Sequence, residues 1–227
     1  MPPGRAGRFR VEHHVGSAAE LHDLDWPEPL VPTVWILQVT SPALVLGSAA
    51  RHHPLDLAPL AQAGLEVVVR RSGGGAVVVE PGNGVWLDVV VPRSDPVWVD
   101  DVSRSFGWLG RVWVTALASL GLTAEVHSGP PDRGALAAAA CFAGLGAGEV
   151  TLDGAKAVGL SQRRTRAGAR FQSCCYRRWN PEPLRALGLD PADLPPVALL
   201  DRDPARLTAA LLEALADLEP PGPDAPG

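Results

Sequence analysis

Lysine is almost missing from this chain of 227 residues: of its 20 basic residues, all but Lys156 are arginine. The accompanying excess of alanine, glycine and proline is typical of a GC-rich coding bias, which explains much of the arginine preference without any function. The formal net charge of -5 leaves no basic footprint, so no nucleic-acid partner is expected. The composition therefore raises one question, which is what an ammonium at position 156 does that a guanidinium does not.

Cysteine and long apolar runs are also scarce. The three cysteines, Cys141, Cys174 and Cys175, are odd in number and two are adjacent, so they form neither a disulfide framework nor a paired CxxC zinc site. The histidine doublets at 13–14 and 52–53 have no carboxylate or cysteine at ligand spacing, and no metal site is predicted. No window approaches the roughly 18 apolar residues of a membrane helix, and the N-terminus has no signal-peptide segment. These absences predict a cytoplasmic protein with reduced thiols and no membrane partner.

What is present predicts a single domain over residues 29–218, with an irregular segment at 1–28 and a disordered tail at 219–227. Residues 65–92 contain three β-branched runs separated by turn compositions, which is typical of three consecutive strands. Further elements are predicted as strands at 33–40, 43–50 and 123–127, and as helices near 54–64, 96–120, 181–188 and 203–217. Strands mixed with helices indicate an α/β or α+β fold, in which helices pack on a sheet.

The helix at 96–120 is predicted from apolar side chains at helical spacing. This stripe consists of Val102, Phe106, Leu109, Val112 and Trp113, and Gly121 follows it as a stop signal.

The segment "GEVTLDGAKAVGLS" predicts a β-hairpin, because Asp-Gly at 153–154 suits a tight primed turn between two alternating runs. Strand side chains alternate between faces, so Val150 and Leu152 share one face of the first arm. Glu149 and Thr151 share the other face. The apolar face is expected to be the buried one.

Lys156, in the second arm, has the parity of Val158 and Leu160, which predicts that its side chain points inward. A buried ammonium either meets an anion or has a lowered pKa, because burial penalises the charged form. As a compact point charge it suits a carboxylate or an acyl carbonyl better than a planar guanidinium does. The alternative is that Lys156 reaches the hairpin edge as a solubilising charge.

A second cluster is the segment "RRSGGGAV", residues 70–77. Three consecutive glycines after a strand let backbone N–H groups approach an anion closely, and the two arginines add charge and donors. The pattern is neither a P-loop nor a dinucleotide-binding turn. A glycine run between strands is also compatible with a simple flexible turn.

Together the two segments resemble the biotin/lipoate protein ligase superfamily, in particular its lipoate-protein ligase A and octanoyltransferase branch. The resemblance covers about residues 30–190. The family's "RRxxGGGAV" followed by "GN" corresponds to Arg70, Arg71, Ser72, Gly73, Gly74, Gly75, Ala76, Val77, Gly82 and Asn83. Its "GxKxxGxxQR" corresponds to Gly154, Lys156, Gly159, Gln162 and Arg163. The chain departs from the family in having Val79 and Ser173 where histidine is usual.

The resemblance implies a class II synthetase-like catalytic domain, with a mixed, largely antiparallel sheet flanked by helices. It also implies attachment of lipoate or octanoate, through an amide, to a lysine of lipoyl-domain acceptor proteins. Lys156 would orient and polarise the acyl carbonyl. The acyl group or acyl-adenylate would be bound by Arg70, Arg71, Ser72, Gly73, Gly74, Gly75, Ala76, Asn83, Gly159 and Ser161.

Three functions remain open on this resemblance, of which the ligase is preferred. A lipoate-protein ligase would use ATP and Mg²⁺ to form lipoyl-adenylate, and would need a separate accessory subunit if it lacks the additional domain that many such ligases carry. An octanoyltransferase would need no cofactor and would take octanoate from acyl carrier protein as a thioester on Cys141, which otherwise packs as a small buried residue. A noncatalytic homologue would only bind an acyl group or a carrier domain.

Overall fold

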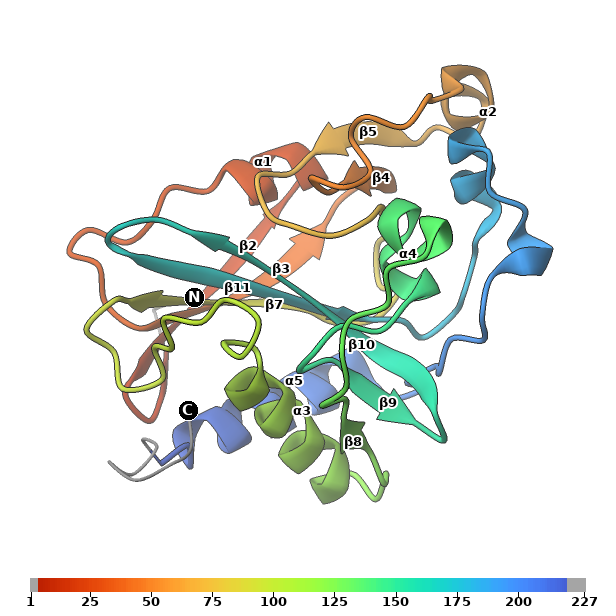
Figure 1. Cartoon of the computed structure of the whole chain (residues 1–227). Helices are drawn as coiled ribbons and strands as arrows, with labels where there is room; N and C mark the ends of the chain where they lie inside the picture. Colours follow the sequence, from red (N-terminus) through yellow and green to blue (C-terminus); the bar gives the residue numbers. More distant parts are fainter. Residues whose placement is uncertain (1–3, 220–227) are drawn as a thin grey trace.

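Residues 4–219 are described by the computed structural model, in which two β-sheets form the centre of the molecule (Figure 1). The large sheet has eight strands in the order β1-β2-β3-β7-β11-β10-β9-β8, and the small sheet has three in the order β5-β4-β6. The strands are β1 (Gly4–Ala6), β2 (Phe9–Gly16), β3 (Thr33–Val39), β4 (Ala43–Leu46), β5 (Glu66–Val69), β6 (Val77–Val79), β7 (Trp86–Pro92), β8 (Glu125–Val126), β9 (Val150–Leu152), β10 (Ala155–Arg164) and β11 (Gly168–Cys175). Every neighbouring pair is antiparallel except β2 with β3 and β4 with β5.

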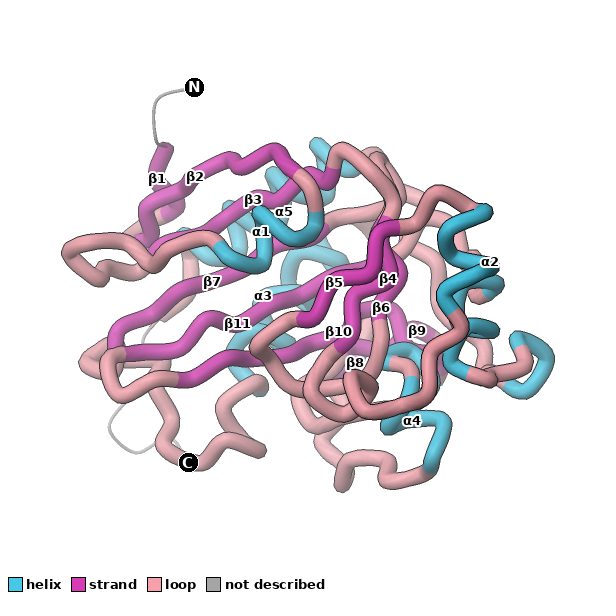
Figure 2. Tube along the Cα trace, turned by 90° about the horizontal axis from the view of Figure 1, so that it is seen from above, coloured by secondary structure: helices cyan, strands magenta, loops and turns pink. Residues whose placement is uncertain are grey.

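The two long helices α3 and α5 cover one face of the large sheet, and the small sheet lies over the other face together with α1 (Figures 1 and 2). The helices are α1 (Ala18–Asp23), α2 (Leu57–Gln62), α3 (Gly107–Ser119), α4 (Ala135–Ala139) and α5 (Pro204–Ala216), with 3-10 helices at Cys141–Ala143, Glu182–Leu187 and Pro191–Asp193. The mixed, mostly antiparallel sheets with flanking helices confirm the predicted fold class.

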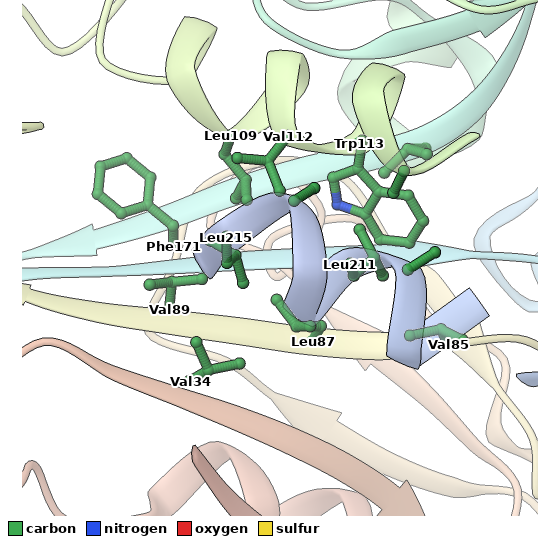
Figure 3. Close-up of a cluster of buried hydrophobic side chains, with 14 of the residues drawn as sticks. Val34, Val85, Leu87, Val89, Leu109, Val112, Trp113, Phe171, Leu211 and Leu215 are labelled. Carbon is green, nitrogen blue, oxygen red and sulfur yellow. The ribbon is translucent and has the colours of Figure 1, made fainter. Parts of the chain in front are cut away.

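The main core lies between the large sheet, α3 and α5 (Figure 3). In β7, Leu87 and Val89 are fully buried and point toward these helices, where Trp113 of α3 and Leu211 of α5 pack against the sheet. Burial of such side chains stabilises the fold by about 2 kcal/mol each. The alternate residue Asp88 points to the opposite face of the sheet, toward the small sheet, where the site described below lies.

The N-terminal segment is not irregular, so the prediction for residues 1–28 was wrong over most of its length. β1 pairs with β2, and β2 pairs in parallel with β3 over residues 10–16. Ser17 then starts α1 with a capping box that it forms with Glu20. The strand pattern of β2 is weak in the sequence because the strand contains several polar residues. The strand that stabilises it by pairing, β3, lies more than 20 residues further along the chain, so no local signal reports the pairing. The predicted tail lies almost entirely outside the described residues.

The helix predicted over 96–120 begins only at Gly107, so its first half was wrong. Val102 is 53% exposed rather than part of the apolar stripe. Carboxylates compete with helical hydrogen bonding in this segment: Asp95 accepts a hydrogen bond from Val97 N at 3.0 Å, and Asp101 accepts one from Ser103 N at 2.8 Å. These local bonds hold residues 95–106 in turns.

Candidate active site

A small cavity lies between the two sheets. Its walls come from the small sheet (Val45, Val77, Val79), from the large sheet (Trp86, Gly159, Leu160, Ser161, Gln172, Ser173, Cys174) and from His22, Arg70 and Cys141. Its volume is about 20 Å³, which is room for about one water molecule. A bound acyl group therefore requires this space to widen.

The hairpin that carries Lys156 is formed as predicted, with Asp153 and Gly154 both at positive φ (49° and 79°), as a primed turn requires. Lys156 points inward and is 4% exposed. The route to that orientation differs from simple alternation, because the pairing register shifts between Lys156 and Val158. The opposite face of the first arm is buried as well, since Thr151 is only 8% exposed. The expectation that this face is exposed to solvent was wrong, because other segments of the chain pack over it.

The ammonium of Lys156 uses all three of its donors within the protein. It donates to the backbone oxygen of Cys141, to Gly144 O at 2.9 Å, and to Glu149 Oε2 at 2.6 Å in a buried ion pair. Burial by itself lowers the pKa of Lys156, but the neighbouring Cys141 and Glu149 outweigh it and the pKa is raised. Lys156 is therefore a fixed positive charge at neutral pH.

Cys141 lies beside this charge, with its Sγ 3.8 Å from Lys156 Nζ, and the side chain is half-buried at the cavity wall. Gly159 makes room for it, because a Cβ at that position would come within 3.1 Å of the Cys141 sulfur. The other two thiols are unreactive by comparison. Burial raises the pKa of Cys174 and raises that of Cys175 to about 12, so both stay protonated.

The glycine-rich loop is braced from within by Arg70. This arginine is 7% exposed, and its Nη2 donates to Gly73 O at 2.8 Å and to Gly75 O at 3.1 Å. The loop is also docked on the segment that carries the cysteine, since Ala76 N donates to Ala139 O at 2.7 Å and Cys141 N donates to Ala76 O at 2.9 Å. Arg70 thus positions the loop and, through it, Cys141.

A buried polar network crosses the cavity wall. Ser72 Oγ donates to Gln172 Oε1, which also accepts from Ser161 Oγ at 3.4 Å. Gln172 Nε2 lies 3.1 Å from Asp88 Oδ2 and 3.3 Å from His22 Nδ1. These bonds connect the glycine-rich loop to three strands of the large sheet and to α1.

A buried ion pair supports the network. Arg170 Nε donates to Asp88 Oδ2 at 2.7 Å, and its two Nη atoms donate to the last carbonyls of α1, Leu21 O at 2.8 Å and His22 O at 3.0 Å. The guanidinium thereby satisfies the open C-terminus of α1 and fixes the place of His22.

The sequence-predicted residues divide into two groups. Most of them gather at or around the cavity: Lys156, Cys141, Arg70, Ser72, Gly73, Gly74, Gly75, Ala76, Gly159 and Ser161. Arg71 instead points to solvent with its side chain 64% exposed, 3.3 Å from Asp23. Asn83 holds a turn through Glu80 and Arg178. It lines a larger groove of about 700 Å³, which shares Val79, Trp86 and Cys174 with the cavity.

Sequence reasoning missed Glu149, Gln172 and His22 as site residues. Glu149 stood on the face of the hairpin that was expected to be exposed. Gln172 had a usable signal, since it directly precedes Ser173, where the family usually has histidine. His22 had none, because it belongs to a segment that was expected to be irregular.

A family model described as the lipoyl protein ligase A/B catalytic domain matches residues 22–187. The chain belongs to this family. No curated protein matches the chain, whereas many solved structures share its fold.

Three of these structures illustrate the likeness of fold. A lipoate-protein ligase A solved with ATP has 16% identity and a TM-score of 0.68, over 93% of this chain and 84% of that one. The Thermoplasma acidophilum bi-partite lipoate protein ligase has 13% identity and a TM-score of 0.58, over 94% and 84%. P. falciparum LipL1 in complex with lipoate has 12% identity and a TM-score of 0.55, over 88% and 58%. None of the helices within residues 4–219 is long and apolar enough to span a membrane.

Proposed function

We propose that this chain transfers an octanoyl or lipoyl group to a lysine of a lipoyl-domain protein through a thioester on Cys141. The observation that carries the proposal is the contact between Cys141 Sγ and Lys156 Nζ, 3.8 Å apart at the wall of the cavity. A cation at this place can stabilise negative charge that develops on the sulfur when the sulfur attacks or leaves an acyl carbonyl. Membership of the lipoyl protein ligase A/B family supports the choice of acyl group and acceptor.

The proposed reaction has two balanced steps. Cys141 gives up its proton, and its thiolate attacks the carbonyl of an acyl carrier protein thioester; the carrier's carbon–sulfur bond breaks and the carrier thiolate takes up the proton. The neutral amine of the acceptor lysine then attacks the carbonyl of the Cys141 thioester; the amide bond forms, the carbon–sulfur bond to Cys141 breaks, and the Cys141 thiolate takes up the proton that the amine loses. The charge of Lys156 stabilises the thiolate at the start and at the end of this sequence.

ATP-dependent ligation of lipoate is the second candidate, favoured by the braced glycine-rich loop and by the likeness of fold to a ligase solved with ATP. The residues around the cavity fit a bound nucleotide only in part. Gly73 has open space around it, and the exposed Arg71 guanidinium suits a phosphate. Glu149 and Asp88, whose carboxylates bond to the cavity residues Leu160 and Gln172, are both held in buried ion pairs, so neither is free to serve Mg²⁺. We therefore rank the transferase first.

The test is the intact mass of a purified lipoyl domain after incubation with the protein. One reaction contains octanoyl carrier protein without ATP, and the other contains lipoate with Mg²⁺ and ATP. We expect an octanoyl mass gain without ATP that Cys141→Ala abolishes. Cys174→Ala is the matched control, because Cys174 lines the same cavity and its thiol stays protonated; this variant should keep most of the activity.

A lipoyl gain that requires ATP and survives Cys141→Ala would establish the ligase instead. If neither reaction modifies the acceptor, even with an added accessory subunit, while the protein still binds the acyl group or the carrier domain, the chain is a noncatalytic binding homologue.

A further inference from the structure

The cavity beside Cys141 and the larger groove next to it lie along one row of residues on the large sheet. Gly159 of β10 is paired directly with Cys174 of β11, Cys174 with Trp86 of β7, and Trp86 with Leu37 of β3. Residues paired in this way stand on the same face of a sheet. The cavity is lined by the row from Gly159 to Trp86, and the groove is lined by the row from Cys174 to Leu37.

The side chains of this row leave a slot that begins at Cys141 and ends at Trp86. Gly159 has no side chain, and a Cβ at its place would come within 3.1 Å of the Cys141 sulfur. Cys174 is small, so the indole of Trp86 is the first large side chain along the row. Val79 of the small sheet lines both the cavity and the groove from the other side. An acyl chain that starts at Cys141 and follows the row therefore meets the indole.

The slot has the length of a medium acyl chain. From Gly159 to Trp86 the row crosses two strand spacings, which is about 10 Å. An extended chain of eight carbons, with bonds of about 1.5 Å, has roughly the same length. The cavity must still widen to admit the chain, but the sheet fixes the distance between its two ends.

The indole of Trp86 is held in its place by two contacts. Its Nε1 donates to Asp88 Oδ1 at 2.8 Å, and Asp88 is fully buried in its ion pair with Arg170. The indole also packs on the ring of His22 at a centroid distance of 4.7 Å. Turning the indole aside would take the donor from a buried carboxylate oxygen, which is costly. Trp86 is therefore a fixed wall of the slot.

Beyond Trp86 the groove has the size and the lining of a site for an alkyl chain. Its volume of about 700 Å³ lies within the range of small-molecule pockets. Its walls are largely apolar and include Leu37, Val39, Val78 and Leu212. Because the indole of Trp86 lines both spaces, removing it would join the cavity to the groove. Each methylene group that an acyl chain then buries there would tighten its binding by about fourfold.

We propose that Trp86 ends the acyl channel at about eight carbons and keeps longer chains out of the groove. Trp86 is then the residue that makes the site specific for medium-length acyl groups. Octanoyl and lipoyl groups, which share an eight-carbon chain, both fit this limit. The inference rests on the proposed function, because it takes Cys141 as the point from which the acyl chain starts.

The experiment measures binding of octanoic and dodecanoic acid to the full chain by calorimetry, and it needs no activity. The unmodified protein should bind octanoic acid at least tenfold more tightly than dodecanoic acid. Trp86→Ala should reverse this order, because the four added methylene groups enter the groove and each contributes up to about fourfold. Trp86→Phe keeps a large ring at the same place and should keep the original order.

Trp98→Ala is the matched control. Like Trp86, Trp98 is partly buried and donates from Nε1 to the aspartate two residues further along the chain, here Asp100 at 2.9 Å. Among the residues that the structure describes, however, it belongs to the walls of neither the cavity nor the groove. This variant should leave the ratio of the two Kd values unchanged. Cys174→Val keeps the indole and narrows the slot one strand earlier, so it should weaken octanoic acid at least tenfold relative to butanoic acid.

The outcomes separate this proposal from the proposed function. Octanoic acid should protect Cys141 from alkylation by iodoacetamide; if it does not bind, or binds without protecting Cys141, both are wrong. If it protects Cys141 but the unmodified protein binds dodecanoic acid as tightly, the role of Trp86 is wrong while the acyl site stands. The same holds if the ratio is unchanged in Trp86→Ala. Should Trp86→Ala fail to fold, the ratio in the unmodified protein and the effect of Cys174→Val decide.

Discussion

The ammonium of Lys156 and the carboxylate of Glu149 form an ion pair of 2.6 Å whose side chains are only 5% and 6% exposed. Two backbone carbonyls, those of Cys141 and Gly144, accept the other protons of the ammonium. Three acceptors around one nitrogen suit a compact ammonium and do not suit a planar fork of donors. This geometry gives a physical reason for a single lysine in a chain that otherwise uses arginine.

Replacing Glu149 by glutamine should destabilise the fold by about 3–5 kcal/mol, because it leaves a buried ammonium without its counter-charge. The amide also has the wrong hydrogen-bonding pattern, since both carboxylate oxygens accept backbone N–H bonds, from Gly146 at 2.7 Å and from Leu160 at 2.9 Å. Equilibrium unfolding in urea measures the change. Glu182→Gln, which breaks an exposed pair with Arg185, is the control and should cost less than about 0.5 kcal/mol. Equal losses in both variants would contradict the assignment.

Lys156→Arg should keep the charge but lose the fit. The larger guanidinium overpacks the site, at a cost of about 1–3 kcal/mol, and moves the positive charge relative to Cys141. Alkylation of Cys141 by iodoacetamide, followed by mass spectrometry at pH 7, should slow about tenfold. Lys156→Met should slow it at least as much, because it removes the charge altogether. Unchanged alkylation in both variants would mean that the ammonium does not activate the thiol.

Gly159→Ala should move Cys141. The added methyl group would lie 3.1 Å from the Cys141 sulfur and 3.0 Å from the ring of Phe142, so the segment must shift away from β10. We expect a loss of about 1–3 kcal/mol in stability and at least a tenfold loss in acyl transfer. The control is Gly134→Ala, where a Cβ meets no atom within 4 Å. It should leave the transfer rate unchanged, and a comparable loss in that variant would contradict the reason given for Gly159.

Acid should destabilise the protein through His22. Its folded-state pKa is lowered well below 6.5, mainly by burial, so below pH 6.5 the unfolded chain binds a proton that the folded state does not. Stability should therefore fall as the pH drops from 6.5, by about 1.4 kcal/mol per pH unit from this one group, until the folded-state pKa is reached. Urea unfolding at pH 5.0 to 7.5 measures the slope, and His22→Gln should flatten it by that amount. Parallel curves for the two proteins would show that His22 titrates normally in the folded state.

Several elements of the fold could be predicted from the sequence, because the residues that determine them are close together in the chain. The Asp-Gly turn requires positive φ at both central residues, and it forms the hairpin that carries Lys156. The three strands within residues 65–92 also form where the β-branched runs stand. They belong to two sheets, however, since β5 and β6 lie in the small one and β7 in the large one.

Tertiary structure decided which polar side chains the site uses. Ser72 and Gln172 are 100 residues apart, and the contact of Gln172 with His22 spans 150. No periodicity within a strand reports such a contact, because alternation gives the face on which a side chain lies and not what covers that face. Glu149 shows the difference. The sequence predicted that its side chain lies on the face of the hairpin opposite to that of Val150, but it did not predict that this face is buried.

By itself, the sequence determined the three strands within residues 65–92, the hairpin turn, the inward Lys156 and the glycine-rich loop, because turn chemistry and side-chain alternation act over a few residues. Only the tertiary structure made a site of them. It brought α1 over the cavity through the bonds from Arg170 to its last carbonyls, and it closed the small sheet over β10 and β11. The physical reason is that a buried charge or donor is tolerated only where distant segments supply its partner.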